Sequence, residues 1–157
     1  TVHCNLSMSD HVDNLIASAA QTLYALKTLK SHGMTLTALT DVCRATLVST
    51  LTYAAPAWYG FASEADISRL QSVLKKAGRW GVWGDLSLQL LDLYEDADST
   101  LFNSVLYNSS HVLHPLLPPK MESGYQLRER SHDRTLSQQT CWSRRNFVIR
   151  SLFKDMY

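Results

Sequence analysis

Apolar residues recur at intervals of three and four over the first eighty positions, and no other feature of this sequence limits its fold as strongly. Because one helical turn takes about 3.6 residues, this spacing gathers apolar side chains on one face of a helix. Three stripes are present: Val12, Leu15, Ile16, Ala19, Leu23 and Leu26; Leu39, Val42, Cys43, Leu47 and Leu51; Ile67, Leu70, Val73, Leu74 and Ala77. We therefore expect a mainly α protein.

Composition favours the same fold class. Leucine occurs 24 times, whereas valine and isoleucine together occur 12 times, and this ratio favours helices over sheet. The 157 residues suit one domain of ordinary size, or one domain with a short appendage. We expect a bundle of about five helices between residue 7 and about residue 110.

Polar residues, glycine and proline predict the ends of the first two helices. The first should begin with Ser7 or Ser9 as its cap and end before Gly33. The second should begin near Thr35 and stop at Ala55, because the proline that follows disfavours helical geometry in the residue before it. Three aromatic residues then crowd a loop.

The remaining helices are predicted with less regular patterns. Ser63 and Asp66 form a capping-box pattern that opens the third helix. A fourth helix is expected over residues 85–95, apolar on nearly all sides, and a fifth begins with Ser99 as its cap. A short C-terminal helix should follow Asn146.

Charge and proline content divide the chain further. We expect a helical domain over residues 1–110, a Pro-rich linker over 111–124, and a basic tail with a C-terminal helix over 125–157. Residues 1–119 hold 7 basic and 10 acidic side chains, whereas residues 120–157 hold 8 basic and 4 acidic ones. Such a tail either binds an anionic partner or is simply solvated.

Residue patterns typical of catalysis or metal binding are weak. His111 and His114 have a spacing that two metal ligands could use, but no further ligand lies nearby in sequence, so a turn is the better interpretation. Three glycines, Gly78, Gly81 and Gly84, match no phosphate-binding loop and favour a tight turn with packed indoles. The sequence therefore predicts no catalytic residue, no metal site, no cofactor and no small-molecule substrate.

Two further groups of residues bear on compartment and charge. The cysteines Cys4, Cys43 and Cys141 are far apart and odd in number, which favours an intracellular, reducing compartment. An acidic cluster is interpreted as a solvated junction between the fourth and fifth helices: Asp85, Asp92, Glu95, Asp96 and Asp98. A chargeless stretch over residues 45–63 contains Pro56 and Gly60, so we expect no contact with a membrane.

Basic residues supply the candidate binding site. The end of the third helix contributes Lys75, Lys76 and Arg79, and the tail contributes Arg128, Arg130, Arg134, Arg144 and Arg145. Tyr125 and Trp142 lie among the tail arginines. Arginine and lysine interleaved with aromatic residues suit a nucleic-acid backbone and unstacked bases.

Several stretches also resemble the C-terminal region of reverse transcriptases from non-LTR (LINE-type) retrotransposons, of the jockey and chicken-repeat kind. These stretches are NLSMSDHVDNLIASAAQTLYALKTLKSHG, LVSTLTYAAPAWYG, HVLHPLLPP, YQLRERSHDRTL and SRRNFVIRSLFKDMY. In the second, Pro56, Trp58 and Tyr59 hold the places of the proline and aromatic pair of the thumb motif.

The resemblance implies a thumb and an accessory tail without catalytic residues, because the palm aspartates of those enzymes have no counterpart here. It implies RNA or an RNA–DNA duplex as partner, together with the palm domain of a parent polymerase, and a nuclear and cytoplasmic location. Magnesium would belong to that palm. The alternative is a helical protein-interaction module that acts through the apolar fourth helix and binds no nucleic acid.

Overall fold

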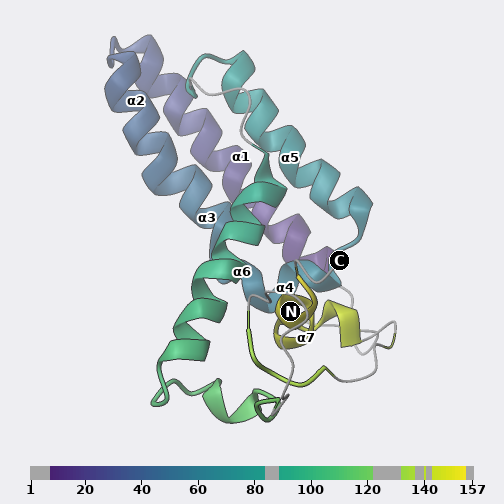
Figure 1. The fold of residues 1–157 in the computed structure, drawn as a ribbon. Helices are drawn as coiled ribbons and strands as arrows, with labels where there is room; N and C mark the ends of the chain where they lie inside the picture. Colours follow the sequence, from purple (N-terminus) through teal and green to yellow (C-terminus); the bar gives the residue numbers. More distant parts are fainter. Residues whose placement is uncertain (1–7, 84–88, 122–131, 137–139, 141–142, 155–157) are drawn as a thin grey trace. The chain divides into compact units, whose positions relative to one another are not determined.

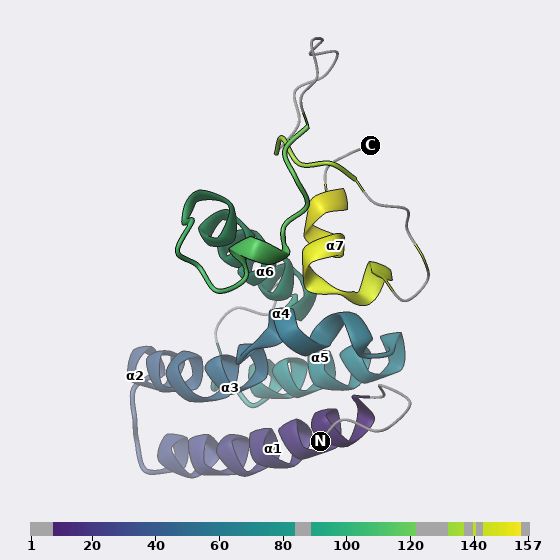
Figure 2. The same ribbon diagram turned by 90° about the horizontal axis from the view of Figure 1, so that it is seen from below.

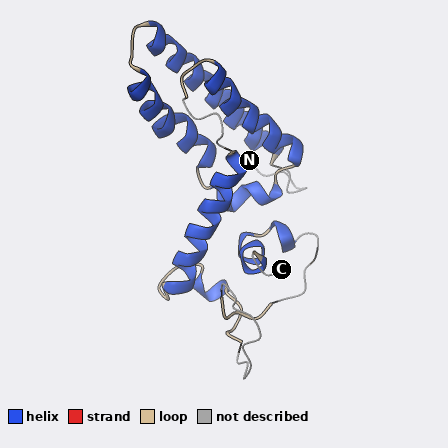
Figure 3. Ribbon diagram, turned by 45° about the horizontal axis from the view of Figure 1, so that its top comes forward, coloured by secondary structure: helices blue, strands red, loops and turns tan. Residues whose placement is uncertain are grey.

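Residues 8–83, 89–121, 132–136, 140 and 143–154 are described by a computed structural model of the chain (Figure 1). The regular elements in these residues are helices, and Figure 3 shows no strand among them. The predicted mainly α class is therefore confirmed. The chain forms two compact units, Thr1–Glu95 and Asp96–Tyr157.

The first unit is built around α1, Ser9–Ser31, which packs against α5, Glu64–Arg79, and against α2, Leu36–Cys43 (Figures 1 and 2). All three predicted stripes enter one core. Its fully buried members include Leu23, Leu26, Leu39, Leu47 and Leu70. The three- and four-residue spacing thus predicted correctly which helix faces are buried.

Helix ends follow the predicted caps in part. Thr35 accepts a hydrogen bond from the Ala38 amide (3.4 Å) at the start of α2, as expected. The cap position of α1 is instead Met8, which has no side-chain oxygen, and Ser9 is the first helical residue. The expected Ser9 cap is therefore wrong, and Ser7 lies outside the described residues.

A π-helical turn, Arg44–Val48, connects α2 to α3, Ser49–Thr52, within one continuous rod. The buried residues of this rod, Leu39, Cys43, Leu47 and Leu51, are spaced by four throughout. In a regular α-helix each four-residue step overshoots one turn by about 40°, so three steps would move the stripe by about 120°. The wider turn absorbs this drift, because its hydrogen bonds close over five residues.

The rod ends at Thr52, three residues before the predicted end at Ala55. Tyr53 leaves the helical region (ψ 123°) and Ala54 takes a left-handed conformation (φ 50°). The proline at 56 then lies in the first turn of a new helix, α4, Ala55–Trp58, where its missing N–H is tolerated. The expected aromatic loop is therefore α4 followed by a 3₁₀ turn, Tyr59–Phe61.

The helix α6, Leu90–Tyr107, corrects the expectation of two separate helices. Ser99 is an internal residue of α6 and not a cap, and residues 84–88 lie outside the described part. Leu90 and Tyr94 are buried in the core of the first unit, whereas Asp98 and Phe102 are buried in the second unit. Asp98 is paired within its unit with Arg150 (2.7 Å), so a buried position of α6 holds a charged residue.

The second unit contains the later part of α6 and α7, Phe147–Phe153. The described residues between them include two 3₁₀ turns, His114–Leu116 and Ser143–Arg145, and an antiparallel bridge between Lys120 and Arg134. Phe102, Val105, Leu117 and Leu152 form the core of this unit. As predicted, Asn146 caps α7 by accepting a hydrogen bond from the Val148 amide (2.9 Å).

The predicted domain boundary and the boundary between the two compact units lie at different residues. The predicted division after residue 110 follows the end of the helical pattern, and α6 ends nearby at Tyr107. The compact units divide inside α6, after Glu95. Among the described helices, none combines the length and the apolar character needed to cross a bilayer.

Candidate nucleic-acid interface

The ends of α1 and α5 bring basic side chains together within the first unit. The two helices run parallel, since Ser9 contacts Asp66 (Oγ to Oδ2, 3.4 Å) and Lys30 contacts Trp80 (Nζ to the carbonyl oxygen, 2.8 Å). Both helices therefore end on the same side, where cations are also favoured by the helix dipoles. We call the resulting set the Trp80 patch: Lys27, Lys30, Lys75, Lys76, Arg79 and Trp80.

Trp80 is the centre of this patch. Its ring is half-buried, and the ammonium groups of Lys27 and Lys76 lie 5.1 and 4.8 Å from the ring centroid. These distances are within the range of cation–π attraction. The ring thus contacts one lysine from each helix.

Gly81 leaves room for the Lys30 side chain in the patch. Its backbone is left-handed (φ +64°), and a Cβ atom placed there would lie 2.5 Å from the Lys30 Nζ atom. Glycine has no such atom and adopts this conformation without strain. The tight turn expected from the three glycines is therefore present at Gly81, although Gly78 lies inside α5 and Gly84 outside the described residues.

The patch is not neutralised by acidic side chains of the described chain. All five of its basic residues are exposed, and within residues 8–83 and the other described ranges none of them forms an ion pair. The opposite end of the same helix pair differs, because Arg69 there contacts Asp13 (2.6 Å) and Asp66 (3.3 Å). Positive charge is therefore concentrated at one end of this unit.

A sixth cation lies over the next indole along the chain. The Arg44 guanidinium, at the start of the π-helical turn, is 5.8 Å from the ring centroid of Trp83. Trp83 is buried, whereas Arg44 is exposed. The contact therefore holds an exposed arginine against a residue of the core. Arg44 is a further basic residue, and no pattern in the sequence singled it out.

The tail arginines that the structure describes differ in their exposure to solvent. Arg134 is buried (9% exposed) and its Nη1 atom donates to the Pro118 carbonyl oxygen (3.2 Å), so the expectation that it is available to phosphates is wrong. Arg144 and Arg145 are exposed in the 3₁₀ turn before α7. Arg128 and Arg130, with Tyr125 and Trp142, lie outside the described residues.

The burial of Arg134 follows from its neighbour His132. The His132 ring lies within hydrogen-bond distance of the Leu152 carbonyl oxygen (Nε2, 2.8 Å) and accepts from the Arg134 amide at Nδ1 (3.1 Å). This ring ties the 132–134 segment to α7 within the second unit. The composition of the tail gave no sign that it contributes to a core.

The acidic residues and histidines make no metal centre in the described part of the chain, where no three potential ligands gather. Asp98 is buried and bidentate with Arg150 (2.7 and 3.1 Å), so the expected solvated junction is wrong for this residue. Asp92, Glu95 and Asp96 are exposed, and Asp85 lies outside the described residues. His111 and His114 lie in a turn, as expected, and both are half-buried. The His111 ring accepts from the Leu113 amide (3.1 Å), and the His114 ring lies within hydrogen-bond distance of the Val105 carbonyl oxygen (2.7 Å).

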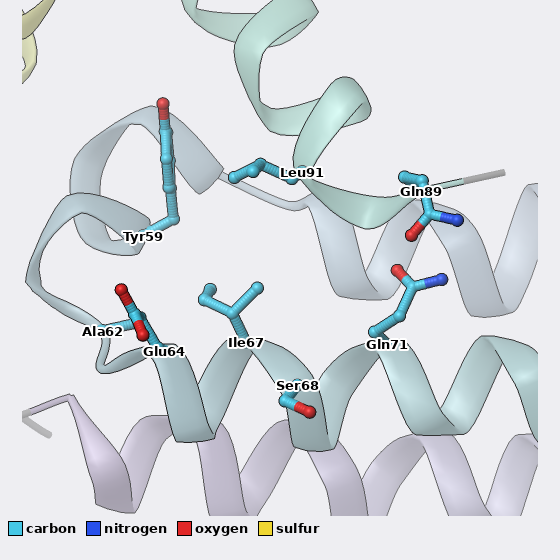
Figure 4. Close-up of a pocket in the computed structure, with 8 residues that line it drawn as sticks. All are labelled: Tyr59, Ala62, Glu64, Ile67, Ser68, Gln71, Gln89 and Leu91. Carbon is cyan, nitrogen blue, oxygen red and sulfur yellow. The ribbon is translucent and has the colours of Figure 1, made fainter.

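A shallow cavity of about 440 Å³ lies elsewhere on the first unit, beside α5 and the start of α6 (Figure 4). Tyr59, Ile67 and Leu91 supply apolar surface, and the amides of Gln71 and Gln89 face each other at one end. Gln71 also accepts a hydrogen bond from the Leu90 amide (2.7 Å), which fixes the start of α6.

Cys43 is a core residue, as expected for a cysteine within an apolar stripe. Its side chain is fully buried, and burial raises the pKa of the thiol to about 11. A thiol with such a pKa stays protonated near neutral pH and is a poor nucleophile.

Comparison with family models, with curated proteins and with solved structures finds no match. The candidate site therefore rests on its own geometry.

Proposed function

We propose that this chain is a non-catalytic nucleic-acid-binding protein whose principal contact is the Trp80 patch. The observation that carries this proposal is the parallel register of α1 and α5, which places Lys27, Lys30 and Lys76 beside Trp80 and brings Lys75 and Arg79 to the same end of the helix pair. In the described part of the chain, none of these five exposed residues forms an ion pair. Phosphate groups are the partners that such a concentration of positive charge attracts.

Counterion release gives the proposal a measurable form. If the five basic residues of the patch neutralise about five phosphates, log affinity should fall against log salt with a slope of about −4.5 on a duplex. The resemblance to reverse transcriptases supports an RNA–DNA duplex as a first ligand to test. The tail arginines Arg144 and Arg145 supply a second, weaker contact in this proposal.

The test compares two charge variants of the full chain by fluorescence anisotropy across a salt series. The patch variant carries Lys75→Gln, Lys76→Gln and Arg79→Gln, and the control variant carries Arg144→Gln and Arg145→Gln. Because three phosphate contacts are removed, the slope of the patch variant should be less negative by about 2 to 3. The slope of the control variant should be less negative by at most about 2. Unchanged affinity and slope in the patch variant would refute the proposal.

A protein-interaction module is the second candidate, and one observation favours it. The surface of the cavity beside Tyr59, Ile67 and Leu91 is mainly apolar, and Leu91 is 45% exposed. Exposed apolar surface of this kind is typical of protein contacts. Two results together would favour this candidate. The unsubstituted chain would have no measurable affinity for RNA or DNA, and Leu91→Glu would weaken the capture of a protein by the chain.

A further inference from the structure

The Trp80 ring has features that the binding of phosphates alone does not require. The indole is partly exposed, and hydrogen bonds hold the Trp80 backbone at its amide and at its carbonyl group. Its amide donates to the Lys76 carbonyl oxygen (3.0 Å), and its own carbonyl oxygen accepts from Lys30 (2.8 Å). These bonds fix the backbone of Trp80, and its side chain packs against the core of the first unit. An aromatic face restrained in this way loses little conformational freedom when a ligand stacks on it.

Two lysines cover the ring that a base would stack on. Lys27 and Lys76 come from different helices, and their ammonium groups lie over the Trp80 ring, 5.1 and 4.8 Å from its centroid. Both lysines have flexible stems, so their ammonium groups can leave the ring for a phosphate oxygen. That exchange replaces a weak cation–π contact with an ion pair and uncovers the ring.

Only an unpaired base can use the uncovered ring. In the interior of a duplex the faces of the bases are covered by their neighbours, so this part of a duplex offers phosphates to the lysines but no base face to the indole. In a single strand every base has a face available for stacking. The patch therefore gains a contact with single strands that it lacks with duplexes.

We infer that Trp80 stacks on an unpaired base while Lys27 and Lys76 bind the flanking phosphates, so that the patch prefers single-stranded nucleic acid or an unpaired end. This inference rests on the proposed function, since it assigns the kind of nucleic acid to the same patch. The stacking is independent of sequence, because every base has a π face.

The test measures the affinity of the full chain for a labelled single-stranded RNA and for the fully paired duplex of the same strand, at one salt concentration. Trp80→Leu removes the aromatic face and Trp80→Phe keeps one, while all five basic residues remain. We expect Trp80→Leu to weaken single-strand binding about tenfold and to leave duplex binding within about twofold. Trp80→Phe should keep most of the single-strand affinity, which also shows that the fold of the patch survives substitution.

The outcomes separate the two proposals. Equal loss of affinity for single strand and duplex in Trp80→Leu, or no loss for either, would overturn the stacking inference and leave nucleic-acid binding intact. Absence of binding to both ligands by the unsubstituted chain would overturn the proposed function and the inference with it. Far-UV circular dichroism and thermal unfolding of each variant identify any loss that comes from unfolding.

Discussion

Two glycines with left-handed backbones differ in what surrounds them, and this difference makes a residue-scale prediction. A Cβ atom added at Gly33 (φ +86°) would meet no atom within 4 Å, whereas one added at Gly81 would meet the Lys30 Nζ atom. Gly33→Ala and Gly81→Ala should each lower the free energy of unfolding by about 1 kcal/mol, because both force alanine into a left-handed conformation. Urea unfolding measures this loss.

Only the second of these variants should also affect binding. An alanine at 81 displaces the Lys30 side chain from the Trp80 carbonyl oxygen and so disturbs the patch. We expect weaker nucleic-acid binding for Gly81→Ala and unchanged binding for Gly33→Ala, measured by anisotropy in conditions where both variants are folded. Equal binding by the two would contradict the positioning role given to Gly81.

Asp66 leads to a pH prediction. The Ser63 hydroxyl donates to its carboxylate (2.8 Å), and this hydrogen bond is the main cause that lowers the pKa of Asp66 below its ordinary value of 3.8. A carboxyl group with a lowered pKa in the folded state stabilises the fold above the unfolded pKa, and this contribution is lost as pH falls through the folded pKa.

Asp66→Ala should therefore destabilise the chain by about 1 to 2 kcal/mol at pH 7, since it removes a buried capping-box partner. The difference from the unsubstituted chain should persist down to about pH 4 and shrink below it. Thermal unfolding between about pH 2.5 and 7 measures both effects, with the exposed Asp41→Ala as control. A difference that grows on acidification would be inconsistent with the capping role.

At the scale of elements, α7 depends on a buried ion pair in the second unit. Asp98 is 3% exposed and Arg150 reaches it with two nitrogen atoms. Asp98→Ala leaves the arginine without its partner, which costs about 3 kcal/mol for a buried pair. Amide hydrogen exchange should accelerate over α7 and remain unchanged over α1.

A double variant separates the contribution of the ion pair to stability from that of side-chain packing. Asp98→Leu with Arg150→Leu removes both charges together, so its loss of stability should be well below the sum of the two single variants. Additive losses would indicate that the two residues act independently, contrary to the hydrogen bonds between them.

Local signals in the sequence were sufficient for most helices. The predicted start of the second helix near Thr35 and the predicted caps at Ser63 and Asn146 are confirmed, and each depends on residues within three positions of one another. The division of α6 was wrong because Asp98 was interpreted as solvated, whereas its partner Arg150 lies 52 residues further along the chain. Pairing over such a separation has no signature in helical periodicity.

The candidate site was predicted to a smaller extent. Lys75, Lys76 and Arg79 were selected as a basic helix end, but Lys27 and Lys30 were not included in the predicted binding site. The parallel register of α1 and α5 unites the two groups, and it depends on packing between helices that are distant in sequence. The tail was interpreted by its net charge, which could not show that Arg134 is buried.

At the scale of the whole molecule, each compact unit has a core of its own. Among the described residues, the core of the first unit has no member beyond Tyr94, although α6 continues to Tyr107. We expect a chain that ends after Ser99 to remain helical and to unfold cooperatively in urea, because that core is complete. A broad, non-cooperative transition would show that the first unit depends on the second for stability.

The π-helical turn at Arg44–Val48 has an evolutionary consequence. Its wider hydrogen bonding accommodates one residue more than an α-helix would hold over the same length, which is the trace that a single-residue insertion leaves in a helix. Deleting the exposed Thr46 would change the buried spacing from four, four, four to four, three, four, the spacing of a regular amphipathic helix. Descendants of a common ancestor should therefore differ in length by one residue at this turn while keeping the same core.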